Sequence, residues 1–312
     1  MLAPAFDSFD GTKIRCWAAV PCSARPTAKI LLVHGLGTHS ESLHFCYLRD
    51  YLTGRGFAVY GFDLRGYGQS GGRRAFVNDW RDFREDLRLF VEMVGRDGGS
   101  APLFLLGVSL GGLIAVNYAV HHPEGIQGLI TVAVALDASG APAWLRMLSA
   151  VLSTIAPKLR LKPGLDVTRL TRDGDAQRAF LSDPLRQEKL TLRLASEAKA
   201  AMAQTLERLS LLKLPLLVLH GSADVIVPSV AGQRLHQLAG SADKEHYVYE
   251  GAYHILSMEI NREQVFEDIG TWVTKRLGST PNSTGVSKAL HSSTTAPANF
   301  GGMVAIWNCT TP

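Results

Sequence analysis

The sequence predicts an α/β fold, in which a mostly parallel sheet is covered by helices on both faces. Short, almost wholly apolar segments alternate along the chain with segments that carry apolar residues at helical spacing. Strands buried on both faces give such continuous apolar runs, and helices that join them give the alternation. Polar residues or glycine follow several of these runs directly: His34, Asp63, Ser109, Asp137 and Gly221. Since functional loops of a parallel sheet lie at the carboxyl ends of its strands, we expect a site there.

The individual elements follow from apolar periodicity and from turn residues. Strands are expected at Ala5–Phe9, Lys13–Val20, Lys29–Val33, Ala58–Phe62, Leu103–Val108, Ile126–Leu136, Leu216–His220 and Tyr247–Tyr249. Asp10-Gly11, between the first two, is a strong hairpin signal. Helices are expected at Ser42–Thr53, Trp80–Val94, Leu110–Val120, Val230–Leu238 and Arg262–Arg276. In Trp80–Val94 the apolar residues recur every three or four positions, which is helical spacing.

Two regions interrupt the alternation of strands and helices. From Ala138 to Leu212 there is no strand signal, only helical pattern at Ala143–Ile155 and Leu185–Leu211. An insertion between two strands, above the carboxyl ends of the sheet, predicts a cap. Ser279–Pro312 is rich in Ser, Thr, Asn, Pro and Gly and predicts a disordered tail. We therefore expect one domain over residues 1–278, with a cap at about 138–212, and a tail over 279–312.

Composition excludes several classes of protein. The chain has 312 residues, 46% hydrophobic and 19% charged, and a net charge of +4, without Lys/Arg-rich blocks. A nucleic-acid partner therefore has no support. The four cysteines are neither paired in spacing nor clustered with histidine, which indicates free thiols in a reducing compartment and no metal site. No secretory signal and no apolar run long enough to span a bilayer is visible, so a cytoplasmic protein is expected.

The segment Leu103–Gly112 carries the strongest chemical signal. An apolar strand runs into Gly107-Val108-Ser109-Leu110-Gly111, and an apolar helix follows. This is the order of a nucleophile elbow, in which glycines make room for a tight turn that exposes the serine hydroxyl. The same pattern recurs at Gly68-Gln69-Ser70-Gly71-Gly72, but no apolar strand precedes it and Arg73-Arg74 follows. Ser109 is therefore the expected nucleophile, and Ser70 is interpreted as a loop residue.

A serine nucleophile needs an imidazole to remove its proton and a carboxylate to orient that imidazole. In this kind of fold the chain order is serine, acid, histidine, each after a strand. His254 lies between the last expected strand and the last helix, and Asp224 follows Leu216–His220. A structural loop histidine and an ordinary turn aspartate are the alternatives. Asp243 is a weaker candidate for the acid because it precedes a strand.

The oxyanion that forms during acyl transfer needs two N–H donors. The backbone of Leu110, directly after the nucleophile, is expected to supply one. The loop His34-Gly35-Leu36-Gly37 follows another strand, and the Leu36 N–H is the best second candidate. The His34 side chain is expected to pack or hydrogen-bond beneath this loop. Asp63-Leu64-Arg65-Gly66 is charged, and we interpret it as a salt-bridged structural turn.

These motifs together resemble the monoacylglycerol lipase branch of the α/β-hydrolases. The resemblance runs from about Leu31 to Trp272 and rests on five motifs in the family's order: His34-Gly35-Leu36-Gly37 with Ser40, Asp63-Leu64-Arg65-Gly66-Tyr67-Gly68-Gln69-Ser70, Gly107-Val108-Ser109-Leu110-Gly111-Gly112, Gly221-Ser222-Ala223-Asp224 and Tyr249-Glu250-Gly251-Ala252-Tyr253-His254. It implies an eight-stranded sheet, a helical cap and hydrolysis of a glycerol mono-ester of a fatty acid. By motif position, Ser109, Asp224 and His254 would be the triad, and Leu36 and Leu110 the oxyanion donors. No metal or organic cofactor is implied.

The sequence departs from this branch at two positions next to the nucleophile. Val108 stands where the branch usually has His, and Leu110 stands where it usually has Met. Leu110 acts through its backbone, so its side chain removes no catalytic group. Val108 bears on substrate preference instead. Gly35 and Val108 are the residues that we expect to contact the substrate.

The predicted function is that of a serine esterase. Ser109 attacks the ester carbonyl, His254 takes and returns the proton, Asp224 orients His254, and water releases the fatty acid from an acyl-enzyme. Monoacylglycerols are the first candidate substrates. Short-chain esters, lysophospholipids and acyl transfer to an alcohol remain open, and a non-catalytic ligand-binding protein is disfavoured by the complete triad.

The apolar segment Trp144–Ile155, with Arg146 as its one charge, leaves two interpretations of the cap open. It forms either a helix buried against the core or a surface that enters a membrane interface and admits lipid substrates. The expected partner is in both cases a small lipid ester. In the second case the protein also makes transient contact with a membrane surface.

Overall fold

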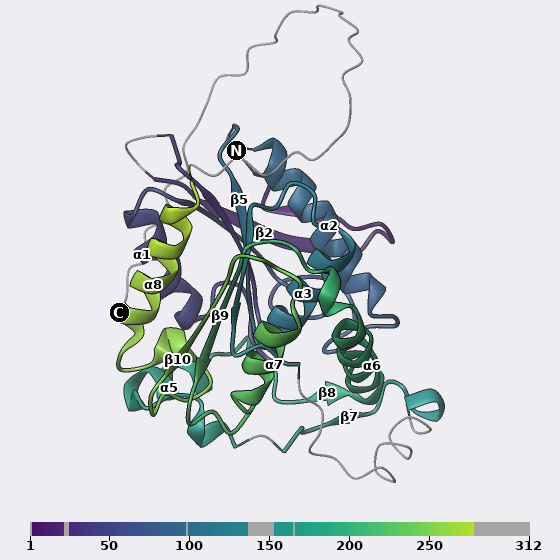
Figure 1. Ribbon diagram of the computed structural model, residues 1–312. Coiled ribbons are helices and arrows are strands. Elements are labelled where there is room, and N and C mark those ends of the chain that lie inside the picture. Colours follow the sequence, from purple (N-terminus) through teal and green to yellow (C-terminus); the bar gives the residue numbers. More distant parts are fainter. Residues whose placement is uncertain (1, 22–24, 98, 137–152, 165, 278–312) are drawn as a thin grey trace, which may run out of the picture. The chain divides into compact units, whose positions relative to one another are not determined.

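The computed structural model describes residues 2–21, 25–97, 99–136, 153–164 and 166–277 (Figure 1). The chain divides into two units, Met1–Ser279 and Thr280–Pro312, and the description below concerns the first. The predicted tail, Asp137 and most of the predicted helix Ala143–Ile155 lie outside the described residues.

Eight strands form the central sheet. They are β1 (Ala5–Asp7), β2 (Lys13–Ala19), β3 (Lys29–Val33), β4 (Ala58–Phe62), β5 (Leu103–Val108), β6 (Gly128–Val132), β9 (Leu216–Gly221) and β10 (Lys244–Tyr249). Their order in the sheet is β1-β2-β4-β3-β5-β6-β9-β10. The pairs β1–β2 and β2–β4 are antiparallel and all other pairs are parallel. The predicted fold class is confirmed, and every expected strand is present.

Two strands differ most from their predicted bounds, because the apolar residues and the residues paired in the sheet do not coincide there. The apolar run Ile126–Leu136 is paired only over β6, and its last residues already form a loop. The last strand begins at Lys244, three residues before the predicted start. Since β10 lies at the edge of the sheet and is half-exposed, its first residues are polar and give no apolar signal.

Helices cover both faces of the sheet. They are α1 (Leu43–Gly54), α2 (Arg81–Arg96), α3 (Leu110–His121), α5 (Gly174–Leu181), α6 (Leu192–Arg208), α7 (Val230–Leu238) and α8 (Arg262–Lys275). In Figure 1, α1 and α8 lie on one side of the sheet, and α2, α3 and α7 on the other. Along β3, Leu31 and Val33 belong to the core beneath α2 and α3, whereas Ile30 and Leu32 belong to the core beneath α1 and α8. This two-sided burial is why the strand is wholly apolar.

The region between β6 and β9 contains more than the predicted helices. Its strands β7 (Arg160–Leu161) and β8 (Leu190–Thr191) form a small antiparallel pair, so the expectation of no strand there was wrong. A pair two residues long has no periodicity to detect. The predicted helix Leu185–Leu211 begins only at Leu192, because the Thr191 hydroxyl caps it by accepting from the Leu194 N–H at 3.3 Å.

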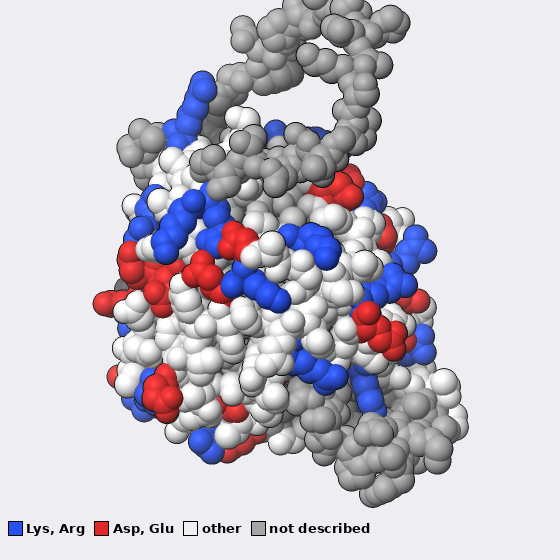
Figure 2. All heavy atoms as spheres, viewed as in Figure 1, with Lys and Arg blue, Asp and Glu red and all other residues white. Residues whose placement is uncertain are grey.

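Two further observations concern the helices and the surface charge. In the part of the chain that the structure describes, no helix has both the length and the apolar character needed to cross a membrane. On the face drawn in Figure 2, basic and acidic side chains are interspersed, and neither sign forms a continuous area.

Candidate active site

The turn between β5 and α3 holds Ser109 in a strained conformation. Its φ is 53°, a left-handed value that is uncommon outside glycine. The flanking glycines are required by close contacts. A Cβ at Gly107 would lie 2.4 Å from the Gly111 carbonyl oxygen, and one at Gly111 would lie 2.2 Å from the Val33 carbonyl oxygen. The turn therefore has the strained, glycine-flanked geometry that is expected of a nucleophile elbow.

The structure brings the three predicted triad residues together. His254 Nε2 lies 3.1 Å from Ser109 Oγ, and His254 Nδ1 lies 2.7 Å from Asp224 Oδ2. Asp224 follows β9 and His254 follows β10, so both loops lie at the carboxyl end of the sheet, as the elbow does. Asp243 instead precedes β10 and pairs with Arg276, whose Nε donates to it at 2.8 Å. It takes no part in the site.

The Asp224 carboxylate is held by four donors. Its Oδ1 accepts from the N–H groups of Ile226 and Val227 at 2.8 and 2.9 Å, and His254 binds Oδ2. His220 Nε2 also lies 3.3 Å from Oδ2. Burial raises the pKa of this carboxyl, but hydrogen bonds from His220 and His254 outweigh it and hold the pKa below its ordinary value. Asp224 is thus ionised and fixed in position.

His220 is a residue of the site that the sequence analysis did not single out. It is fully buried at the end of β9, and its Nε2 donates to the Val227 carbonyl at 2.9 Å while facing Asp224. Both neighbours of this nitrogen are acceptors, so Nε2 carries the proton. The available signal was a histidine among apolar strand residues, four positions before the acid.

His34 supports the predicted oxyanion loop from below. It is fully buried, which lowers the pKa of its imidazole to about 4 and leaves it neutral. Its Nε2 accepts from the Leu64 N–H at 2.9 Å, so its Nδ1 donates to the Gly35 carbonyl at 2.8 Å. Since the Gly35–Leu36 peptide is trans, the Leu36 N–H points away from that carbonyl. The expected hydrogen bond of His34 beneath its loop is confirmed.

The second expected oxyanion donor is Leu110. It is the first residue of α3, where backbone N–H groups lack an acceptor within the helix. Leu36 and Leu110 border the same cavity as Ser109. The arrangement can therefore present two N–H groups to an oxygen bound beside the serine hydroxyl.

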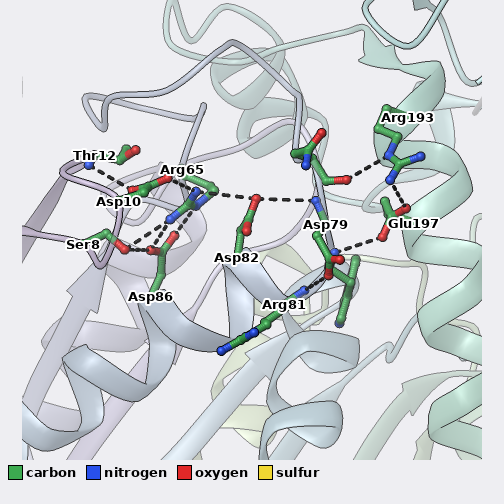
Figure 3. Close-up of polar contacts among 12 residues, drawn as sticks. Ser8, Asp10, Thr12, Arg65, Asp79, Arg81, Asp82, Asp86, Arg193 and Glu197 are labelled. Carbon is green, nitrogen blue, oxygen red and sulfur yellow. Dashed lines mark hydrogen bonds and ion pairs between the residues drawn. The ribbon is translucent and has the colours of Figure 1, made fainter. Parts of the chain in front are cut away.

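The charged turn Asp63–Gly66 is structural, as predicted. Arg65 donates to Asp86 at 2.7 Å and to Asp10 at 2.8 Å and lies 3.6 Å from Asp82, as Figure 3 shows. This network ties the β1–β2 hairpin to the start of α2. Glu197 of α6, which is labelled on the other side of Figure 3, accepts a hydrogen bond from the Trp80 N–H at 2.9 Å. The region between β6 and β9, called the inserted region below, is therefore hydrogen-bonded to the core beside α2.

Comparison with known proteins identifies the family. The family model described as "Serine aminopeptidase, S33" matches residues 24–261. The chain belongs to this family. Its curated relatives include the monoglyceride lipase of Homo sapiens, 32% identical over 88% of this chain and 90% of that protein. They also include the monoacylglycerol lipase of Mycolicibacterium smegmatis, 30% identical over 81% of this chain and 90% of that protein.

Solved structures agree with these relatives. The monoacylglycerol lipase of Paleococcus ferrophilus superposes with a TM-score of 0.75 at 31% identity, over 84% of this chain and 99% of that one. The Saccharomyces cerevisiae monoglyceride lipase, solved with a substrate analog, gives a TM-score of 0.78 at 26% identity, over 88% of this chain and 95% of that one. The S33 chain is thus an α/β-hydrolase of the monoacylglycerol lipase branch and a carboxylic ester hydrolase, as the motifs implied.

A cavity of about 720 Å³ opens above the triad of this S33 hydrolase, within the range of small-molecule sites. Its wall includes Ser109, His254 and the expected substrate contacts Gly35 and Val108. Gly35 is tightly packed, because a Cβ there would lie 3.2 Å from the Val108 carbonyl and 3.3 Å from Ser109 Cβ. Val108 stands at the position that usually holds His in this branch, and it gives the cavity an apolar wall there.

The inserted region of the S33 hydrolase supplies the other side of the cavity, and it touches the oxyanion loop directly. The Gln187 N–H donates to the Gly37 carbonyl at 2.8 Å. A Cβ at Gly37, whose φ is +77°, would lie 2.6 Å from the Gln187 carbonyl oxygen. Glycine at position 37 therefore permits both the turn and this contact.

Proposed function

We propose that this enzyme hydrolyses monoacylglycerols to fatty acid and glycerol through an acyl-enzyme on Ser109. The observation that carries the proposal is the hydrogen-bonded series Ser109–His254–Asp224. Ser109 and His254 of this series line a largely apolar cavity of about 720 Å³. Two relatives named as monoglyceride and monoacylglycerol lipases support the substrate class.

The proposed steps use the groups in the positions described above. Ser109 Oγ attacks the ester carbonyl carbon while His254 Nε2 takes its proton, and the Leu36 and Leu110 N–H groups stabilise the resulting oxyanion. His254 then gives the proton to the glycerol oxygen as the carbon–oxygen bond breaks. A water molecule, deprotonated by His254, then attacks the acyl carbon. The bond from that carbon to Ser109 Oγ breaks, His254 returns the proton to Oγ, and the fatty acid leaves. Asp224 keeps the Nδ1 proton of His254 in place throughout.

One observation favours lysophospholipids as a second substrate class. Lysine and arginine side chains outnumber acidic ones among the described residues that border the cavity: Lys162, Arg186, Lys189 and Lys199 against Glu188. Glu188 pairs with Lys162 at 2.8 Å and with Arg186 at 2.6 Å, which offsets part of the positive charge. A phosphate-bearing head group would be attracted by the net positive charge of this wall.

The described part of the inserted region also supports transient contact with a membrane surface. Ile155, Leu159 and Leu161 are 74%, 49% and 47% exposed, and basic residues Lys158 and Arg160 lie between them in the sequence. Apolar side chains flanked by cations suit the interface of an anionic bilayer. Replacing Ile155 and Leu159 by Ser should reduce binding to anionic vesicles while leaving turnover of a soluble ester unchanged.

The proposed function is tested by hydrolysis of a chain-length series of monoacylglycerols. Matched nitrophenyl esters, lysophosphatidylcholine and lysophosphatidic acid are measured beside them, with Ser109→Ala as the inactive control. We expect the highest kcat/KM with a monoacylglycerol. Preference for short nitrophenyl esters alone would contradict the lipase assignment, and activity of Ser109→Ala would contradict the mechanism.

A further inference from the structure

His44 is a second histidine in the wall of the active-site cavity. It is the second residue of α1, is 2% exposed and borders the cavity with Ser109 and His254. Its ring packs edge-on against Phe180 of α5, with 5.8 Å between ring centres, and against Phe45. The mechanism above does not use this residue.

One nitrogen of the His44 ring is fixed and the other is available. Nδ1 lies 2.8 Å from Ser42 Oγ, which lies 2.8 Å from Thr38 Oγ1. Nε2 forms no hydrogen bond with the residues that the structure describes. It is also not one of their fully buried polar atoms that lack a hydrogen-bond partner. Because the ring borders the cavity, this nitrogen can serve a bound molecule.

The chemical character of His44 is that of a neutral imidazole. Burial, with the nearby imidazoles of His39, His34 and His254, lowers the pKa of His44 to about 3. A neutral ring nitrogen donates or accepts one hydrogen bond, according to its tautomer. A hydroxyl group can complement either tautomer, whereas a phosphate is better matched by the cations at the cavity wall.

The position of His44 assigns it to the alcohol end of the ester. During the reaction His254 Nε2 must reach the leaving alcohol oxygen, so that part of the substrate lies toward His254. Leu43 packs in one apolar cluster with Ile255. Since these are the neighbours of His44 and His254, the two histidines lie in the same part of the cavity wall. The cavity wall also contains apolar residues of α6 that suit an acyl chain: Leu194, Ala198 and Met202.

We propose that His44 is a specificity residue whose Nε2 hydrogen-bonds a free hydroxyl on the alcohol part of the ester. The inference rests on the proposed function and deepens it, because it selects esters of polyols over esters of simple alcohols. Ser42 and Thr38 act as positioning residues that hold the ring in this orientation. The acyl chain and the triad make the same contacts with either class of ester.

The test compares two substrates that share one acyl chain, a monoacylglycerol and the corresponding methyl ester, in identical detergent micelles. A His44→Phe variant keeps a ring against Phe180 but has no nitrogen. It should lower kcat/KM for the monoacylglycerol by roughly 10- to 100-fold, as loss of a buried hydrogen bond to substrate does, and change the methyl ester less than about threefold. His44→Gln retains a donor and an acceptor and should keep most of the selectivity. Ser42→Ala should give an intermediate loss.

The outcomes separate this inference from the proposed function. A wild-type enzyme that cleaves the methyl ester faster than the monoacylglycerol overturns both. A wild-type enzyme that prefers the monoacylglycerol, with the same preference in His44→Phe, overturns the role of His44 alone. Thermal unfolding of each variant identifies a folding defect, and a loss of activity that is equal for both esters also counts against the inference.

Discussion

The chain contains the same pentapeptide pattern twice, and the two serines have opposite environments. Ser109 Oγ has a basic nitrogen at 3.1 Å and borders the cavity. Ser70 Oγ donates to the Asp63 carbonyl at 2.6 Å and accepts from the Arg15 N–H at 2.9 Å. The pattern itself specifies only a tight, glycine-bounded turn. Ser109 is expected to be reactive because its turn faces the loop that carries His254.

The side chain of His34 is one of the links between the two regions. His34 accepts a hydrogen bond from Leu64, in the loop that contains Ser70, and donates one to Gly35, in the oxyanion loop. The loop that contains Ser70 therefore supports the orientation of the loop that is expected to bind the oxyanion. Substitutions can separate these contributions.

The largest difference is expected between the two serine-to-alanine variants. Ser109→Ala should lower kcat for an ester by about 10⁴-fold or more, because the nucleophile is lost. Ser70→Ala should keep kcat within a few-fold, since Ser70 meets no substrate. Steady-state hydrolysis of one ester by both variants checks this, and comparable losses would contradict the division between the two loops.

Replacing Asp224 by Asn should lower kcat by about 10⁴-fold while the fold is retained, because an amide cannot hold His254 in the required tautomer. Asp243→Asn is the matched control, since Asp243 pairs with Arg276 away from the site. Kinetics and thermal unfolding of both variants are the measurements. A comparable loss of kcat in Asp243→Asn would sink the assignment of the acid.

The buried His34 predicts a loss of stability in acid. Its pKa is lowered to about 4 in the folded protein, from 6.5. Between these values the unfolded chain binds a proton that the folded one does not, so the free energy of unfolding falls as the pH falls, by roughly 3 kcal/mol in total. Denaturant unfolding of the wild type and of His34→Gln between pH 7 and 4 measures the part due to His34, because the buried His44, with a pKa of about 3, loses stability over the same range. A His34→Gln variant with an unchanged slope would count against this source.

Ser70→Ala should cost about 1–3 kcal/mol of stability, because the Arg15 N–H loses its acceptor and the Asp63 carbonyl its donor in a buried place. Ser109→Ala should not destabilise the protein to this extent. Urea unfolding of both variants provides the comparison. Equal midpoints would show that the Ser70 contacts contribute little.

The smallest effect is expected at His220. Its replacement by Leu removes one of the donors to Asp224 and should lower kcat by about tenfold, and His220→Gln should recover most of it. The two variants are compared by kcat and by thermal midpoint. A loss that tracks stability rather than the presence of a donor would indicate a packing role only.

The sheet was predictable because each inner strand is buried on both faces and so is continuously apolar. The start of β10 was not, since an edge strand needs no apolar residues. The elbow, Asp224 and His254 follow from chain order and strand ends. His220 and His44 could not be assigned a place in the site, because only the packing of β9, α1 and α5 reveals what their ring nitrogens face.

The contact between Gln187 and Gly37 couples the inserted region directly to the loop that is expected to bind the oxyanion. Substrate range in this enzyme is therefore not a separable module. Exchanging the insertion for that of a relative would also alter a support of the oxyanion loop, so such a chimaera inherits turnover together with selectivity. To change selectivity without changing turnover, the hydrogen bond from the Gln187 N–H to the Gly37 carbonyl should be kept.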